Sequence, residues 1–286
     1  MISIRRGVAL LLVAAASYFA PMQGSTADEQ LNKLLPDNIR QAGQLNVASN
    51  TSYPPFAFRN EAGEATGVEP SVVRALAAKL GIKAAFTSLD FATVLPSITA
   101  GRFDLGVAGY SNTEERRKVV EFVNYLYAVD GLVVLKGNPD GLSVDDLCGK
   151  TVSSSQGAYQ TVNLTALSDN CVKSGKPAIN MQVFQGTPTQ LVALKSRRVQ
   201  GSNIDFAVGA YMVQKEPNVL EQAPGILKNA AGQKLVMGMI MKKGDVQLAK
   251  ALHAALNAII ADGSYAKILR EWNIPDESKV PEATIN

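Results

Sequence analysis

Hydrophobic positions in this chain form short runs that alternate with stretches of helical spacing. The apolar run Leu45–Ala48 predicts a strand. The pattern continues with a helix over Pro70–Leu80, a strand over Ala84–Thr87, a helix over Phe91–Ala100 and a strand over Phe103–Ala108. Strands that alternate with helices in this way indicate a parallel sheet with crossover helices.

A second series of the same kind follows the apolar run Leu126–Leu135, which we expect to be extended. Its predicted strands are Thr151–Ser154, Met181–Phe184, Ser202–Ile204 and Leu235–Met241, and its predicted helices are Gly157–Leu167, Pro188–Ser196 and Val208–Lys215. From Val246 to Trp272 the apolar residues recur at helical spacing, and Gly263 divides this tail into two helices.

The order of these elements predicts an α/β fold with two lobes, each a mostly parallel sheet flanked by helices. We place lobe 1 at residues 28–127 plus 238–286 and lobe 2, which interrupts it, at residues 128–237. The chain then passes twice between the lobes, and two such crossings form a hinge.

The N-terminal residues have the pattern of a secretory signal peptide. Arg5 and Arg6 precede the apolar run Val8–Ala16, and the small residues Ser25–Ala27 provide a cleavage site. The apolar run is shorter than the roughly 20 residues that cross a membrane. We therefore predict export with removal of residues 1–27, and an uncleaved membrane anchor is the alternative.

Charge and cysteine content narrow the function classes. The 286 residues include 28 basic and 25 acidic side chains, and the basic residues are scattered, so we expect no nucleic-acid partner. Cys148 and Cys171 are an even pair in an exported protein and favour a disulfide. The single histidine, His253, is far from both in sequence. We expect neither a metal site nor a cofactor.

Ser111 and Arg116 follow the predicted strand Phe103–Ala108 and so lie at its carboxyl end. Open α/β sheets bind ligands at that edge. A guanidinium group offers a planar fork of donors that matches a carboxylate with two hydrogen bonds. This arrangement predicts capture of a small carboxylate-bearing molecule. The alternative is that Arg116 is a surface residue of the charged run Glu114–Lys118.

Several segments together resemble the polar-amino-acid branch of the bacterial extracellular solute-binding proteins, the receptors of ABC importers. In the family's order they are Leu35–Phe58, Gly67–Gly81, Asp90–Phe122, Gly149–Gly157, Leu194–Asp205, Met237–Asp245 and Ile268–Pro275. The resemblance implies a monomeric periplasmic protein whose two lobes close like a clamshell on an amino acid or a derivative and deliver it to the permease subunits.

The resemblance also implies roles for individual residues. Arg116 falls where the family grips the ligand's α-carboxylate, and Asp205 falls where a carboxylate meets the α-ammonium. Tyr53 and Phe91 occupy the aromatic positions that sandwich the ligand, and Asn50 the position that often sets selectivity. The complete set of expected ligand contacts is Asn50, Tyr53, Phe91, Ala108, Gly109, Ser111, Arg116, Ala158, Tyr159 and Asp205.

Three positions depart from the family pattern. Ala158 replaces a usual threonine or serine, so one donor to the carboxylate is missing, and Tyr159 is positioned to fill the space. Ser71 replaces an acidic residue, with Glu69 nearby, and Gln200 replaces an aspartate. The first departure leaves open a ligand other than an ordinary α-amino acid, whereas we expect the other two to affect structure only.

Two other functions fit parts of the sequence. The family includes dehydratases that act on cyclic precursors of phenylalanine, and such an arogenate or prephenate dehydratase would need Asp205 or Glu69 as general acid. A sensory domain of a receptor kinase would need a membrane-spanning segment before the chain ends at Asn286. We expect a receptor that is not an enzyme.

Overall fold

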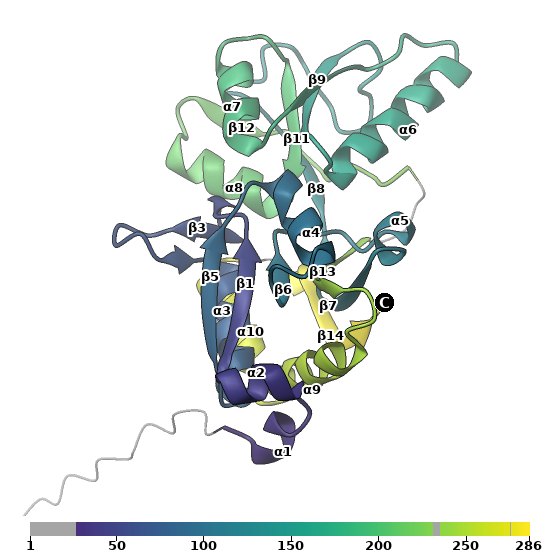
Figure 1. Ribbon diagram of the computed structural model, residues 1–286. Helices are drawn as coiled ribbons and strands as arrows, with labels where there is room; N and C mark the ends of the chain where they lie inside the picture. Colours follow the sequence, from purple (N-terminus) through teal and green to yellow (C-terminus); the bar gives the residue numbers. More distant parts are fainter. Residues whose placement is uncertain (1–26, 231–234, 275) are drawn as a thin grey trace, which may run out of the picture.

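A computed structural model of the chain describes residues 27–230, 235–274 and 276–286. The predicted signal peptide falls almost wholly on residues 1–26, outside the described residues. In the part that is described, no helix has the length and apolar character needed to cross a membrane. The described chain forms two lobes, one above the other in Figure 1, each with its own sheet. The predicted two-lobed α/β fold is therefore confirmed.

The sheet of lobe 1 has six strands in the order β14-β7-β13-β6-β1-β5. Their bounds are Gln44–Ser49 (β1), Lys83–Ser88 (β5), Leu105–Val107 (β6), Val120–Ala128 (β7), Leu235–Lys242 (β13) and Lys279–Ile285 (β14). A separate three-stranded sheet beside it consists of Ser52–Tyr53 (β2), Ala57–Arg59 (β3) and Ala65–Thr66 (β4).

The sheet of lobe 2 has five strands in the order β10-β9-β11-β8-β12. Their bounds are Asp130–Leu135 (β8), Thr151–Ser155 (β9), Asn180–Phe184 (β10), Gly201–Asp205 (β11) and Leu220–Gln222 (β12). The parallel part, β10-β9-β11, carries the carboxyl strand ends that face lobe 1.

Both sheets are mixed, and not mostly parallel as the sequence predicts. In lobe 1, β1 runs parallel to β5 and β6, but β7, β13 and β14 pair antiparallel. In lobe 2, β8 and β12 pair antiparallel. The cause is the insertion of lobe 2: β7 carries the chain out of lobe 1 and β13 returns it beside β7, so the two must run in opposite directions. The exact lobe boundaries stay a prediction.

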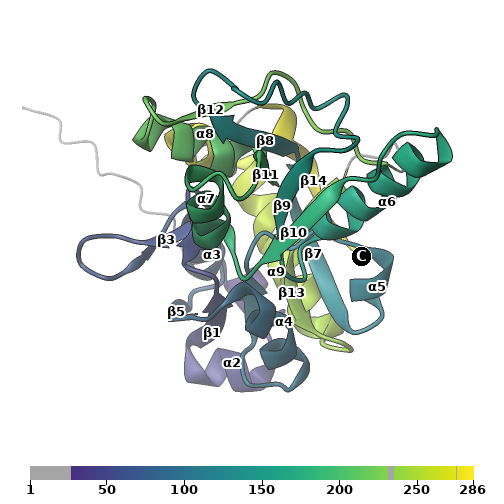
Figure 2. The same cartoon turned by 90° about the horizontal axis from the view of Figure 1, so that it is seen from above.

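Helices cover both faces of each sheet (Figure 2). Lobe 1 has α1 (Glu29–Asn32), α2 (Asp37–Ala42), α3 (Val68–Lys79), α4 (Phe91–Thr99), α5 (Glu114–Arg117), α9 (Val246–Ala261), α10 (Ser264–Glu271) and the 3-10 turn Asp276–Ser278. Lobe 2 has α6 (Tyr159–Lys173), α7 (Thr187–Lys195) and α8 (Phe206–Lys215). Gly263, with φ of 81°, separates α9 from α10 as predicted.

One strand of lobe 1, β7, is only partly predicted by the hydrophobic pattern. β7 begins at Val120, six residues before the apolar run suggests, because Glu121 and Asn124 interrupt the pattern. Lys243 forms an ion pair with Glu121 at 3.1 Å, and Asn124 donates to Thr284 of β14 at 2.9 Å. These polar groups are therefore compatible with a buried strand, since each has a partner on a neighbouring segment.

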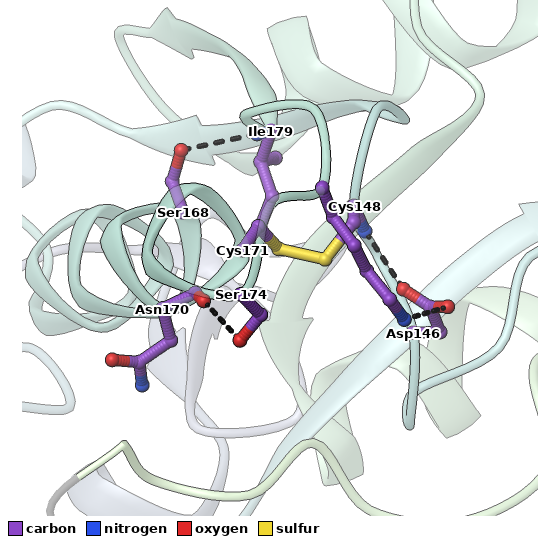
Figure 3. Close-up of a disulfide and its surroundings, with 8 residues drawn as sticks. Asp146, Cys148, Ser168, Asn170, Cys171, Ser174 and Ile179 are labelled. Atoms are coloured by element: carbon purple, nitrogen blue, oxygen red, sulfur yellow. Dashed lines mark hydrogen bonds and ion pairs between the residues drawn. A yellow bond between two sulfur atoms is a disulfide. The ribbon is translucent and has the colours of Figure 1, made fainter.

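The predicted disulfide between Cys148 and Cys171 is confirmed, with 5.6 Å between the two Cα atoms. It joins the loop before β9 to the last turns of α6 (Figure 3). Asp146 accepts from the Cys148 main-chain N–H at 3.1 Å, and Ser168 accepts from the Ile179 main-chain N–H at 3.0 Å. This part of lobe 2 is thus held by a covalent bond and by local hydrogen bonds.

Candidate functional site

A cavity between the two lobes is lined by residues from both of them. It contains nine of the ten ligand contacts expected from the sequence, namely Asn50, Tyr53, Phe91, Ala108, Gly109, Ser111, Arg116, Ala158 and Tyr159. Six further lining residues, which the sequence reasoning did not single out, are Ser155, Gln160, Gly186, Thr187, Asn203 and Ile204. Most of these lie at or just beyond the carboxyl ends of β9, β10 and β11, so the rule that identified Arg116 in lobe 1 also applies here.

Arg116 connects the two walls of this cavity. It lies in the one-turn helix α5, and Thr113 caps that helix by accepting from the Arg116 N–H. Nη1 donates to the carbonyl of Ser111 at 2.9 Å, and Nη2 donates across the cleft to the carbonyl of Gly157 at 2.8 Å. The guanidinium carbon lies 4.9 Å from the centre of the Tyr110 ring.

No carboxylate balances this charge within the described residues, because none lies within 4.0 Å of Arg116. Burial lowers the pKa of the Arg116 side chain, and the nearby Tyr110 partly opposes that shift. A guanidinium whose hydrogen bonds go only to carbonyl oxygens keeps its full positive charge. The site can therefore attract and bind an anion.

Glu69 holds the lobe 1 wall in place. Its Oε1 accepts from the Gly109 main-chain N–H at 2.8 Å and from the Tyr125 hydroxyl at 2.7 Å. Burial raises the pKa of Glu69, and these two hydrogen bonds oppose the rise. Gly109 has φ of 62°, and a β-carbon there would lie 3.0 Å from Cε1 of Tyr53. The turn is thus fixed from behind by Glu69 and fits closely against Tyr53 in front.

The two aromatic residues expected around the ligand each stack on a neighbour within lobe 1. The Tyr53 ring lies 5.6 Å from that of Phe56, and the Phe91 ring lies 4.9 Å from that of Tyr110, both nearly parallel. Tyr110 also donates its hydroxyl to the Phe91 carbonyl at 2.8 Å. Both rings line the cavity, and their contact with a ligand stays a prediction.

Asp205 is the one expected contact that lies outside the cavity lining. It is 3 % exposed, and its carboxylate accepts from the Ala207 N–H at 2.9 Å, which caps α8. Burial raises its pKa, as does the charge of Asp130, and main-chain N–H groups oppose the rise. Its neighbours Asn203 and Ile204 do line the cavity. Asp205 therefore lies directly behind the wall, and its contact with an ammonium group stays a prediction.

Asp130 is a second carboxyl group beside Asp205, opposite it on the antiparallel strand β8. Gln160, which lines the cavity, donates its side-chain amide to Asp130 at 2.7 Å. Burial raises the pKa of Asp130 to about 6, and the bond from Gln160 limits the rise. The two carboxyl groups give this end of the cleft a negative character, opposite in sign to Arg116.

The positions that depart from the family pattern have distinct structural roles. Ala158 is the N-cap of α6 and has no side-chain oxygen to cap it. Asn50, which matches the family pattern, lines the cavity, and its Oδ1 also accepts from the Ser52 N–H at 3.1 Å, as in a turn. Ser71 accepts from the Trp272 indole at 3.2 Å, and Gln200 accepts from the Thr151 N–H at 2.8 Å. In the described part of the chain no group of three histidine, cysteine or acidic side chains could hold a metal ion.

Comparison with known proteins identifies the family to which the sequence is similar. The sequence profile of the bacterial extracellular solute-binding proteins, family 3, matches residues 45–275. The arginine-binding protein ArgT of Corynebacterium glutamicum is 28 % identical over 90 % of this chain and 83 % of its own length. The L-cystine-binding protein TcyJ of Escherichia coli K12 is 26 % identical over 95 % of this chain and 97 % of its own length.

Solved structures show the same architecture. An ancestral arginine-binding protein bound to arginine is 30 % identical, with a TM-score of 0.70 over 80 % of this chain and 98 % of its own. An ancestral amino acid-binding protein described as a precursor of cyclohexadienyl dehydratase is 26 % identical, with a TM-score of 0.68 over 84 % of this chain and 99 % of its own.

Proposed function

We propose that this chain, which belongs to the bacterial extracellular solute-binding proteins of family 3, is the periplasmic receptor of an ABC importer. In this proposal it captures a polar amino acid or an amino-acid derivative between its lobes and delivers it to the permease subunits. The named relatives, which bind arginine or cystine, support an amino acid as the ligand class.

The observation that carries the proposal is the unbalanced guanidinium of Arg116. It lies in the cavity wall, donates to one carbonyl of each lobe, and has no carboxylate partner among the described residues. A ligand carboxylate would supply the missing charge and accept the bidentate pair of bonds. The ligand would then bind both lobes, and its binding would favour the closed arrangement.

The opposite charge of an amino acid has a candidate partner behind the other wall. Burying an unpaired ammonium costs several kcal/mol, so an acceptor is required. Asp205 is the carboxylate that the family pattern provides for this role, and its charge contributes to raising the pKa of Tyr53, which lines the cavity. We expect the ammonium to reach Asp205 in the liganded protein.

Tight binding of so small a ligand requires that the two lobes enclose it. Micromolar binding corresponds to about −8 kcal/mol, which for a ligand of roughly ten heavy atoms is about −0.8 kcal/mol per atom. That value is high for any exposed site. Lobe contacts beside the cavity, such as Gln185 donating to Asp90 at 3.3 Å, close the cleft around the bound molecule.

A dehydratase is the second candidate, because one structural relative is a precursor of such an enzyme. Its chemistry needs a general acid in contact with the substrate. Among the described residues the cavity lining contains no acidic side chain, Asp205 caps α8, and Glu69 is hydrogen-bonded to Gly109 and Tyr125. The site therefore favours binding without turnover.

A thermal-shift screen of amino acids and their derivatives tests the proposal. A ligand at a hundred times its Kd stabilises the folded protein by about 2.7 kcal/mol. For a protein of this size that corresponds to a rise in Tm of roughly 5–10 °C. If no amino acid or derivative raised the Tm, the receptor hypothesis would be contradicted. If the protein consumed prephenate or arogenate, as measured by a change in absorbance, the dehydratase hypothesis would be supported instead.

A further inference from the structure

Asn203 in the strand β11 lines the cavity between the lobes. Its side chain is 1 % exposed, yet neither Oδ1 nor Nδ2 has a hydrogen-bond partner among the described residues. The polar side chains around it are paired: Ser153 donates to Ser202 at 2.9 Å, and Gln190 donates to Ser155 at 2.5 Å. Asn203 is thus a buried amide without a partner among the described residues, beside side chains that do form hydrogen bonds.

A buried amide in this position needs a reason. Strand interiors favour β-branched and aromatic residues, and a buried polar group without a partner destabilises the fold. A leucine would fill a similar volume without that cost. The Asn203 amide gains a hydrogen-bond partner if a polar group of the ligand lies against it when the lobes close. Since Asn203 presents one acceptor and one donor group, the matching ligand group both donates and accepts hydrogen bonds.

The charge of the cavity wall restricts that group further. Arg116 is the only charged side chain in the lining formed by the described residues. Of the two nearby carboxyl groups, Asp205 is assigned to the α-ammonium by the proposed function, and Asp130 accepts from the side-chain amide of Gln160. A second charged group, placed against Asn203, would have no counter-charge of its own in the lining formed by the described residues, which is unfavourable.

We infer that Asn203 determines the specificity of this site, and that it binds a neutral amide-type group on the ligand. The ligand class is then an amino acid or derivative with a carboxamide, ureido or secondary-amide group beyond its α-carbon. This inference rests on the proposed function, because Arg116 must hold the carboxylate for the distal group to reach Asn203.

Calorimetric titration with matched ligand pairs tests the inference. Citrulline and arginine differ at the distal group mainly in charge, and glutamine can be compared with glutamate and methionine. We expect at least one amide-type ligand to bind roughly tenfold or more tightly than each of its charged or apolar counterparts. Tighter binding of arginine than citrulline, together with no preference for glutamine, would overturn the inference and leave the proposed receptor intact. If no amino acid bound at all, the proposed function itself would fail.

Two substitutions assign the effect to Asn203. Asn203→Leu should reduce the preference for the amide-type ligand to below about threefold without lowering the Tm of the unliganded protein. Asn203→Asp should shift the preference from citrulline toward arginine, which a purely structural role would not do. Asn218→Leu, at an exposed position, is the matched control and should keep the wild-type preference. Wild-type selectivity in both Asn203 variants would contradict the inference and indicate a bridging water.

Discussion

Replacing Arg116 by alanine removes the only charge in the cavity wall, within the part of the chain that the structure describes. In the unliganded protein the change breaks the bonds to the carbonyls of Ser111 and Gly157 and the packing on Tyr110. A hydrogen bond contributes about 1 kcal/mol net. Both carbonyls lie at the cleft, where water can replace the guanidinium. We therefore expect the free energy of unfolding to fall by no more than about 2 kcal/mol.

The effect on binding should be larger. A hydrogen bond to a charged partner contributes about 1.5–3 kcal/mol, and a bidentate carboxylate receives two of them. Their loss, about 3–6 kcal/mol, weakens binding by about 10²- to 10⁴-fold. Arg116→Lys keeps the charge and loses the planar fork, so it should bind with intermediate affinity.

Isothermal titration with the ligand found by thermal shift measures these changes, and circular dichroism confirms that each variant is folded. Arg102→Ala is the matched control, because Arg102 is an exposed arginine in the turn after α4. Its affinity should equal that of the wild type. A folded Arg116→Ala variant that binds with wild-type affinity would refute the role of this guanidinium.

Three further predictions concern the surroundings of the site. Glu69→Ala removes the acceptor of the Gly109 N–H, so both the Tm and the ligand affinity measured by calorimetry should fall. Glu69→Gln keeps an acceptor oxygen and should keep most of both. Equal ligand affinity in the wild type and both variants would count against the role of Glu69 in positioning Gly109. Burial raises the pKa of Asp130 to about 6 from 3.8, so this carboxyl binds its proton more tightly in the folded state and its contribution to stability falls as pH rises from 4 to 6. Asp130→Asn should flatten the profile of Tm against pH over that range and raise Tm at pH 7; an unchanged profile would contradict the assignment. Replacing both Cys148 and Cys171 by serine should lower the free energy of unfolding in a urea titration by about 3 kcal/mol and leave ligand affinity unchanged, and a loss of affinity would show that the disulfide acts on the site.

The sequence predicts the parts of this protein that follow periodic rules. Alternating strands and helices give two α/β lobes, and the rule that ligands bind at carboxyl strand ends identifies Arg116, which the structure places in the cavity wall. The strand β7 is less visible, because Glu121 and Asn124 interrupt its apolar run and their partners lie far away in sequence. Such distant pairing cannot be seen in a local pattern.

The same limitation applies to the site. Asp205 is absent from the cavity lining, and its carboxylate caps α8 by accepting from the Ala207 N–H, while its contact with a ligand stays a prediction. The sequence gives no signal for Asn203, because a single asparagine in an apolar strand usually has a hydrogen-bond partner on a neighbouring segment. Only the three-dimensional structure shows that its amide is buried and without a partner among the described residues.

Equilibrium dialysis tests the central claim most directly. The purified protein is dialysed against a mixture of amino acids and derivatives, and the retained molecules are identified by mass spectrometry beside the Arg116→Ala variant. We predict about one equivalent of a single amino-acid ligand, recovered chemically unchanged, with none retained by the variant. Retention of no ligand by the wild type, or recovery of a converted product, would contradict the account.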